Sequence, residues 1–162
     1  MAKRAVSEAE VPVVRTVTQR VIYADTDRMG VVYHATYLRY LEAARVEFIR
    51  DRGFAYSAME RLGFGLPVVD LSVSYLASAI YDDIVTVRVG MTKLSPARVH
   101  FCYRVSVEPG DRHGDPRSEA LVLLRAETKH GCVSLEDGRA ALIPAPAFEA
   151  LGAYWDTQNS VP

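Results

Sequence analysis

One long amphipathic stretch, residues 36–52, most constrains what this chain can fold into. Its apolar residues recur at i, i+4, i+7 and i+11, which is one stripe of a helix; they are Tyr37, Leu41, Ala44 and Phe48. Thr36 is a candidate N-cap, and Gly53 suits the left-handed conformation that often follows a helix. The pattern predicts one helix that starts between residues 34 and 37 and ends at residue 52.

Most of the remaining chain has the pattern of β-strands. Residues 11–22 are rich in β-branched side chains, and after the helix three runs alternate apolar and polar residues, at 67–76, 85–91 and 99–108. Residues 120–133 predict a further long strand, whose apolar residues 121–124 suggest burial on both faces. Asp137-Gly138 predicts a hairpin turn, and residues 147–154 a short C-terminal helix. The pattern predicts an α+β domain in which one antiparallel sheet of about five or six strands wraps around the long helix.

Length and charge set the domain organisation and exclude some partners. With 162 residues, we expect a single domain over residues 11–155 and polar tails at 1–10 and 156–162. A net charge of −1 argues against nucleic acid or an anionic membrane as a partner. No apolar run reaches the ~18–20 residues of a membrane span, and no signal peptide is evident, so we expect a cytoplasmic protein.

Two His-x-Cys pairs, at residues 100–102 and 130–132, raise the question of a metal site. If the strand through residue 100 pairs with the strand through residue 126, position 100 faces Ala126 and position 102 faces Leu124. The second pair then lies roughly 10–20 Å away along the strand, too far to share an ion. We therefore expect no metal site, and two cysteines are too few for a disulfide framework.

A short acidic loop, residues 25–30, stands just ahead of the long helix. Unpaired amides and the positive end of the helix dipole favour an anion at this position. A carboxylate beside such amide donors is the arrangement that acyl transfer requires. Most aspartates before a helix, however, only shape a turn or cap the helix, and the spacing of Asp25 and Asp27 leaves both interpretations open.

Residues 23–40 carry a longer motif, which resembles the signature of the hotdog-fold acyl-CoA thioesterases. The subgroup is that of 4-hydroxybenzoyl-CoA thioesterase and the Tol-Pal-associated acyl-CoA thioesterase. The residues that match are Tyr23-x-Asp25-Thr26-Asp27-x-x-Gly30-Val31-Val32-Tyr33-His34-Ala35-x-Tyr37-Leu38-Arg39-Tyr40, followed by Tyr75-x-Ala77 and Asp82-Asp83-Ile84. The resemblance implies a hotdog fold and the hydrolysis of an acyl-CoA to a free acid and coenzyme A, with no metal or separate cofactor.

The resemblance also implies roles for the loop residues. Asp27, the second aspartate, is expected to attack the thioester carbonyl or to activate water for that attack. The backbone amide of His34 is the expected oxyanion donor, while the His34 side chain either positions Asp27 or water or only packs. The residues expected at the substrate are Gly30, Val31, Tyr33 and Tyr37, although aromatic residues at a helix start often serve as core.

For the coenzyme A phosphates, the candidates are Lys93, Arg98 and Arg125, each of which is also an ordinary surface charge. Residues 95–97 are Ser-Pro-Ala where the 4-hydroxybenzoyl enzyme carries a basic cluster, so we expect fewer or differently placed phosphate contacts. The open face and edge strand of such a sheet need cover, and the family implies a homodimer or a dimer-of-dimers tetramer.

Several alternatives stay open at this point. The acyl group is short aliphatic or aromatic, and it is carried on coenzyme A or on an acyl carrier protein. A hotdog hydratase or dehydratase is a second enzymatic interpretation, but its Asp and His motif is not found in this sequence. A non-catalytic acyl-CoA-binding or complex-associated protein is the alternative from another functional class.

Overall fold

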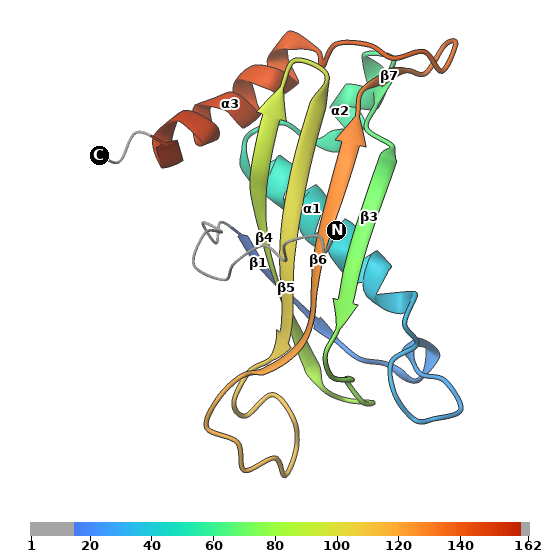
Figure 1. The fold of residues 1–162 in the computed structure, drawn as a ribbon, viewed down its shortest axis with the longest axis vertical. Helices are drawn as coiled ribbons and strands as arrows, with labels where there is room; N and C mark the ends of the chain where they lie inside the picture. Colours follow the sequence, from blue (N-terminus) through green and yellow to red (C-terminus); the bar gives the residue numbers. More distant parts are fainter. Residues whose placement is uncertain (1–14, 160–162) are drawn as a thin grey trace, which may run out of the picture.

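The computed structural model describes residues 15–159 of the chain, with side chains described as far as residue 153. The elements in chain order are β1 (Arg15–Arg20), the 3-10 helix η2 (Tyr23–Asp25), α1 (Thr36–Asp51), α2 (Tyr56–Arg61), β2 (Phe64–Gly65), β3 (Val68–Tyr75), β4 (Ile84–Ser95), β5 (Arg98–Val107), β6 (Leu121–Gly131), β7 (Val133–Ser134) and α3 (Ala145–Asn159) (Figure 1). The N-terminal part of the predicted first strand, residues 11–14, and the predicted tail at 1–10 lie outside the described residues.

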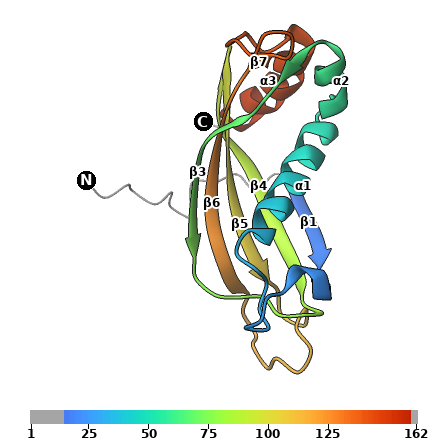
Figure 2. The same ribbon diagram turned by 90° about the vertical axis from the view of Figure 1, so that its right-hand side faces the viewer.

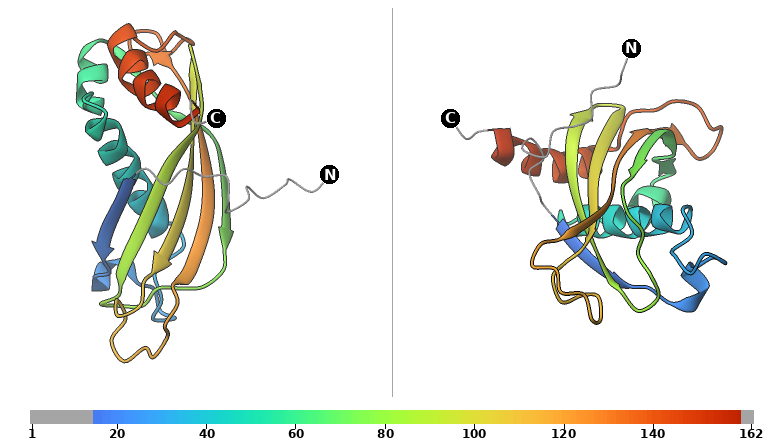
Figure 3. Two further views of the ribbon diagram at one scale, coloured as in Figure 1. Left: turned by 90° about the vertical axis from the view of Figure 1, so that its left-hand side faces the viewer. Right: turned by 60° about the horizontal axis from the view of Figure 1, so that its bottom comes forward.

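Five strands form one antiparallel sheet in the order β1-β4-β5-β6-β3, and β2 pairs with β7 in a small second sheet. The large sheet curves around α1, which lies along its concave face (Figures 2 and 3). This arrangement confirms the predicted α+β hotdog fold and the predicted number of strands. The C-terminal helix α3 is longer than the predicted residues 147–154 and packs near the end of β4.

Helix α1 forms where the apolar stripe predicts it. Tyr37, Leu41, Ala44 and Phe48 are all buried against the sheet. Gly53 follows the helix with a φ of +83°, which confirms its predicted left-handed conformation. This stripe packs against the inner face of the sheet, and together they form the hydrophobic core of the domain.

The predicted N-cap was wrong. Ala35 caps α1 without a side-chain hydrogen bond and already has helical dihedral angles, so Thr36 is the first helical residue. The chain enters the helix through a turn in which the amide of Thr36 donates to the carbonyl of Tyr33 over 2.9 Å. The Thr36 hydroxyl instead donates to the carbonyl of Asp25, at 3.4 Å. The N-terminus of α1 is therefore tied to the preceding loop instead of being capped by its own hydroxyl.

The predicted pairing of β5 with β6 was wrong by three residues, since His100 faces Lys129 and Cys102 faces Glu127. An irregularity between Val105 and Ser106, together with the long connection between the two strands, shifts the register. Cys102 lies on the face of the sheet away from α1, where its thiol donates to the carbonyl of Gly90. Within residues 15–159 no cluster of three or more His, Cys, Asp or Glu side chains has metal-site geometry.

None of the helices among the described residues is both long enough and apolar enough to cross a membrane.

Candidate active site

The acidic loop forms a tight hairpin just ahead of α1. A β-bridge joins Thr26 to Val32, and within it the amide of Asp27 donates to the carbonyl of Val31 over 2.9 Å. The amide of Gly30 donates back to the carbonyl of Asp27, also over 2.9 Å. Gly30 has a φ of +74°, a conformation that favours glycine because it has no Cβ. The hairpin therefore fixes the backbone on both sides of Asp27.

The loop orients the Asp27 carboxylate through only one of its two oxygens. Its Oδ1 accepts the amide of Met29 over 2.8 Å, and the side chain is half-buried. Among residues 15–159, no donor and no cation is bonded to Oδ2. One oxygen of Asp27 is thus held by the backbone, and the other is available to act as a nucleophile or a base.

The neighbouring Asp25 has a different environment. Its side chain is buried, and its Oδ2 accepts the amide of Ile22 over 3.1 Å. The carbonyl of Asp25 accepts the amide of Tyr33 over 2.9 Å, and its Oδ1 lies 3.9 Å from the Arg39 guanidinium. Burial raises the pKa of the nearby Tyr40, and the Asp25 carboxylate adds to that increase. Asp25 therefore braces the loop against α1, while Asp27 keeps a free oxygen.

The backbone at His34 offers an amide donor at the start of α1. Its carbonyl accepts the Tyr75 hydroxyl over 2.8 Å, which fixes the orientation of this residue. Within the described part of the chain, the His34 amide has no hydrogen-bond acceptor. An unpaired amide at a helix N-terminus lies in the positive field of the helix dipole, so it suits a developing oxyanion.

The His34 ring contacts aromatic side chains. Its centroid lies 4.2 Å from that of Tyr33 and 6.4 Å, edge-on, from that of Tyr75. No hydrogen bond joins the ring to Asp27 or to any other described residue. Of the two alternatives for this side chain, packing has the support of these contacts.

The other predicted substrate residues of the motif gather around the same loop. Val31 pairs with Ile80 in a β-bridge, and the Tyr33 side chain is exposed. Tyr37 is only 2% exposed, and its hydroxyl accepts the amide of Ala79 over 2.9 Å. Burial raises the pKa of Tyr37, so this phenol stays protonated at neutral pH. Tyr37 therefore forms the buried support beneath the loop.

The three predicted phosphate ligands do not join this group within one chain. Lys93 and Arg98 are exposed at the far end of β4 and β5, and Lys93 is roughly 30 Å along the strand from Ile84, near the loop. Arg125 faces Arg104 and Ser74 on the outer face of the sheet. The described chain thus brings together Asp27, His34 and the motif residues, and leaves these three basic residues apart from them.

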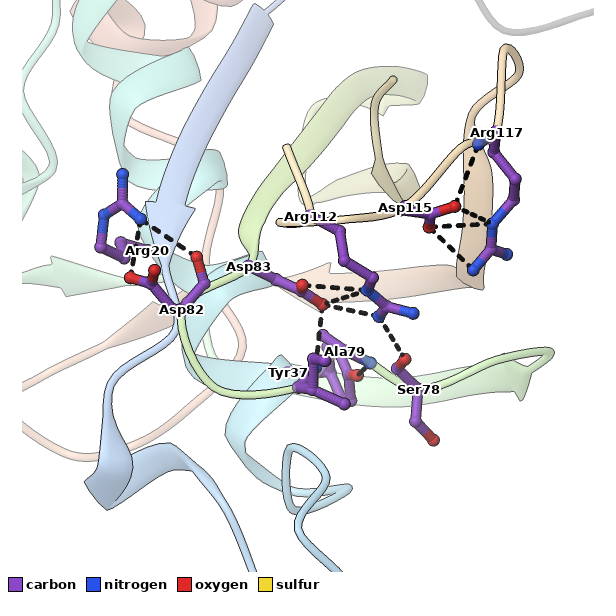
Figure 4. A network of polar contacts seen from close by, with 10 residues as sticks. Arg20, Tyr37, Ser78, Ala79, Asp82, Asp83, Arg112, Asp115 and Arg117 are labelled. Atoms are coloured by element: carbon purple, nitrogen blue, oxygen red, sulfur yellow. Dashed lines mark hydrogen bonds and ion pairs between the residues drawn. The ribbon is translucent and has the colours of Figure 1, made fainter. Parts of the chain in front are cut away.

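Sequence reasoning assigned no role to two features of this site. Tyr75 belongs to the second stretch of the resemblance, but only the fold shows that its hydroxyl holds the His34 carbonyl. Arg112, in the polar connection between β5 and β6, bonds to Asp83 beside the same loop (Figure 4). No local periodicity marks Arg112, because its partner is distant in sequence.

Comparison with known proteins identifies the family of this chain. The model of the "Thioesterase-like superfamily" matches residues 21–151. The acyl-CoA thioesterase YbgC of Haemophilus influenzae is 31% identical over 126 residues, which cover 77% of this chain and 85% of that protein. A 1,4-dihydroxy-2-naphthoyl-CoA hydrolase of Synechocystis is 29% identical over 132 residues, which cover 81% of this chain and 89% of that protein.

Solved structures show the same likeness. The DHNA-CoA thioesterase of Staphylococcus aureus has a TM-score of 0.78 at 28% identity, covering 89% of this chain and 92% of that one. The 4-hydroxybenzoyl-CoA thioesterase of Pseudomonas sp. strain CBS-3 has a TM-score of 0.71 at 25% identity, covering 84% of this chain and 97% of that one. The family match over most of the chain, the relatives and the fold lead to one conclusion: this chain belongs to the thioesterase-like superfamily.

Proposed function

We propose that this protein is an acyl-CoA thioesterase that hydrolyses an acyl-CoA to a free acid and coenzyme A, with Asp27 as the nucleophile or general base. One observation carries the assignment of Asp27. Its carboxylate is held at Oδ1 by the amide of Met29 while Oδ2 stays unbonded among the described residues, just ahead of a helix start where the His34 amide has no acceptor.

In the proposed reaction, Asp27 either attacks the thioester carbonyl or takes a proton from the water that attacks it. The His34 amide donates to the oxyanion that forms, and one such donor is typically worth ~2.7–4 kcal/mol. The coenzyme A thiolate then leaves, and because it is a good leaving group the reaction needs little help from a general acid. If Asp27 is the nucleophile, water hydrolyses the resulting mixed anhydride and restores the carboxylate. Neither route uses a metal or a separate cofactor.

A short aliphatic or aromatic acyl group is the proposed substrate. The rings of Tyr33 and Tyr75 contact the ring of His34, the residue of the proposed oxyanion donor, and a flat aromatic acyl group would stack against such a surface. The relatives named for naphthoyl-CoA and hydroxybenzoyl-CoA support the same choice.

Thiol release from a panel of thioesters tests this function. We expect the purified full-length protein to release thiol from benzoyl- or hydroxybenzoyl-CoA, and more slowly from hexanoyl- and palmitoyl-CoA. The same acyl groups on acyl carrier protein form the second arm, and a higher kcat/KM there would favour the carrier-protein alternative. Binding of the acyl-CoAs without any thiol release would instead support a non-catalytic protein.

We also propose that the protein is a homodimer that pairs through β3. This strand is an edge of the five-stranded sheet, and it exposes Val68, Val69 and Leu71. An exposed apolar edge strand readily pairs with another chain unless it is covered. A dimer built this way leaves further association into a tetramer open.

The double variant Val69→Asp/Leu71→Asp is expected to shift the protein from about twice its chain mass to a single chain. In a dimer that pairs through β3, the two new carboxylates of one protomer repel those of its partner, and the apolar contact is lost. Sedimentation velocity measures the change, and Leu142→Asp serves as the control because Leu142 is exposed but lies outside β3. A wild-type protein that sediments as a monomer would rule out the β3 dimer.

A further inference from the structure

A buried ion pair joins the connection between β5 and β6 to the turn before β4 (Figure 4). The Arg112 guanidinium binds the Asp83 carboxylate through two nitrogens, with Nε 3.0 Å from Oδ1 and Nη2 2.6 Å from Oδ2. The side chains of Asp83 and Arg112 are 1% and 16% exposed. A carboxylate this buried is stable only when its charge is paired and its remaining acceptor sites are satisfied, since it has lost its hydration.

The Arg112 and Asp83 side chains also bind the backbone of one short segment, residues 78–83. Nη2 of Arg112 also donates to the carbonyl of Ser78 over 3.0 Å. Oδ2 of Asp83 accepts the amide of Ile80 over 2.9 Å. Arg112 therefore binds the segment near its start through Ser78 and at its end through Asp83.

The opposite side of the same segment contacts the candidate site. The amide of Ala79 donates to the Tyr37 hydroxyl, and its carbonyl accepts the amide of Val32, both over 2.9 Å. Ile80 pairs with Val31, whose carbonyl accepts the amide of Asp27. Hydrogen bonds and one β-bridge therefore connect the ion pair to Asp27, and residues 78–80 lie between Arg112 and the site.

We infer that Arg112 is a positioning residue for the thioesterase reaction, acting through Asp83 and residues 78–80 to fix the backbone of residues 31–34. This role rests on the proposed function. Displacing reacting groups by about 1 Å can cost on the order of 100-fold in rate, so a clamp on this backbone affects kcat without touching substrate. Lysine cannot replace Arg112, because an ammonium group lacks the planar fork that binds Asp83 through two nitrogens.

The test compares Arg112→Lys with a matched change in the same connection, Arg117→Gln. We expect Arg112→Lys to lower kcat by about 10- to 100-fold with KM changed by less than about threefold. Arg117 is also paired with an aspartate, Asp115, but its side chain is 46% exposed. The kcat of Arg117→Gln is expected to stay within about twofold of the wild type, because exposed ion pairs contribute little.

A positional role is separated from a purely structural one by chemical rescue. In Arg112→Ala, added guanidinium ion at tens of millimolar is expected to restore kcat several-fold, while sodium at the same ionic strength does not. All rates are measured well below the Tm of each variant and per folded protein, as judged by circular dichroism. If Arg112→Ala does not fold, Asp83→Asn is measured instead without guanidinium, and its kcat is expected to fall as in Arg112→Lys.

Variants at Arg112 that lower Tm but keep a wild-type kcat per folded protein would overturn the positioning role and leave the thioesterase function intact. A wild-type protein that hydrolyses no thioester would overturn both.

Discussion

Asp27→Asn is expected to lower kcat by about 1,000-fold or more, with KM nearly unchanged. Asparagine keeps the size of the side chain and an oxygen that can accept the Met29 amide, so the hairpin is preserved. The amide group is neither a useful nucleophile nor a base at neutral pH. The variant therefore still binds substrate but lacks the group that reacts in the transition state. A 1,000-fold loss corresponds to about 4 kcal/mol of transition-state stabilisation.

Steady-state thiol release measures this effect, and Asp25→Asn is the matched control from the same loop. Because the Asp25 carboxylate is turned inward to the amide of Ile22, its replacement is expected to lower Tm while kcat per folded protein falls far less. Asp27→Asn is expected to leave the free energy of unfolding within about 0.5 kcal/mol of the wild type. A kcat near the wild-type value in Asp27→Asn would reject the assignment of Asp27.

The same residue allows its two possible roles to be separated. A single turnover in water labelled with oxygen-18, followed by mass spectrometry of the peptide around residue 27, detects label in the Asp27 side chain. Label there shows that an anhydride formed on Asp27 and was hydrolysed at the aspartyl carbon. A product acid labelled from the first turnover, with unlabelled Asp27, excludes hydrolysis at the aspartyl carbon; trapping an Asp27 anhydride with hydroxylamine then distinguishes hydrolysis at the acyl carbon from the general-base route.

Much of this architecture could be predicted from the sequence because the relevant signals are local. The burial of α1 follows from a stripe within sixteen residues, and each alternating run became a strand. Asp27 and the His34 amide are seven positions apart, so one continuous motif specified both. Gly30 could be expected at a tight turn for the same reason, and its positive φ supports that expectation.

The features that sequence reasoning missed depend on how distant segments meet. The β5–β6 register is set by an irregularity and by the connection between the strands, neither of which alternation reports. Arg112 and Asp83 are 29 positions apart, so no spacing rule relates them. Lys93, Arg98 and Arg125 were grouped as basic residues of late strands, but Arg125 pairs with Arg104, six residues along β5 from Arg98, so position along the sheet separates Arg125 from the other two.

A second large effect is expected on stability, from a chain of hydrogen bonds in the core. Arg45 donates to the Tyr103 hydroxyl at 3.3 Å, and bonds of 2.9 Å then join Tyr103 to Thr128, Thr128 to Nε2 of His130, and Nδ1 of His130 to the carbonyl of Leu66. A guanidinium can only donate and a carbonyl can only accept. With a neutral imidazole, each hydroxyl therefore donates toward His130, and Nδ1 carries the proton.

Protonating His130 disrupts this chain, because Nε2 then becomes a donor and one of the two hydroxyl protons loses its acceptor. Burial is the main cause that lowers the pKa of His130 from its ordinary 6.5 to about 4, and the positive charges of Arg45 and His100 add to it. The unfolded chain binds this proton more readily, so the contribution is fully present above pH 6.5 and is lost as pH falls toward 4. The loss amounts to about 3 kcal/mol.

Denaturant unfolding of the full chain at pH 7, 6, 5 and 4 measures this contribution. Other groups also titrate in this range, so the comparison is with His130→Gln, which keeps hydrogen-bonding capacity and cannot gain a proton. We expect the variant to be less stable than the wild type at pH 7 and to lose about 3 kcal/mol less between pH 7 and pH 4. His113→Gln, at an exposed position, is expected to follow the wild-type curve. If the free energy of unfolding of His130→Gln ran parallel to that of the wild type from pH 7 to pH 4, His130 would accept its proton as easily in the folded core as in the unfolded chain. That result would contradict the proposed direction of the hydrogen-bond chain.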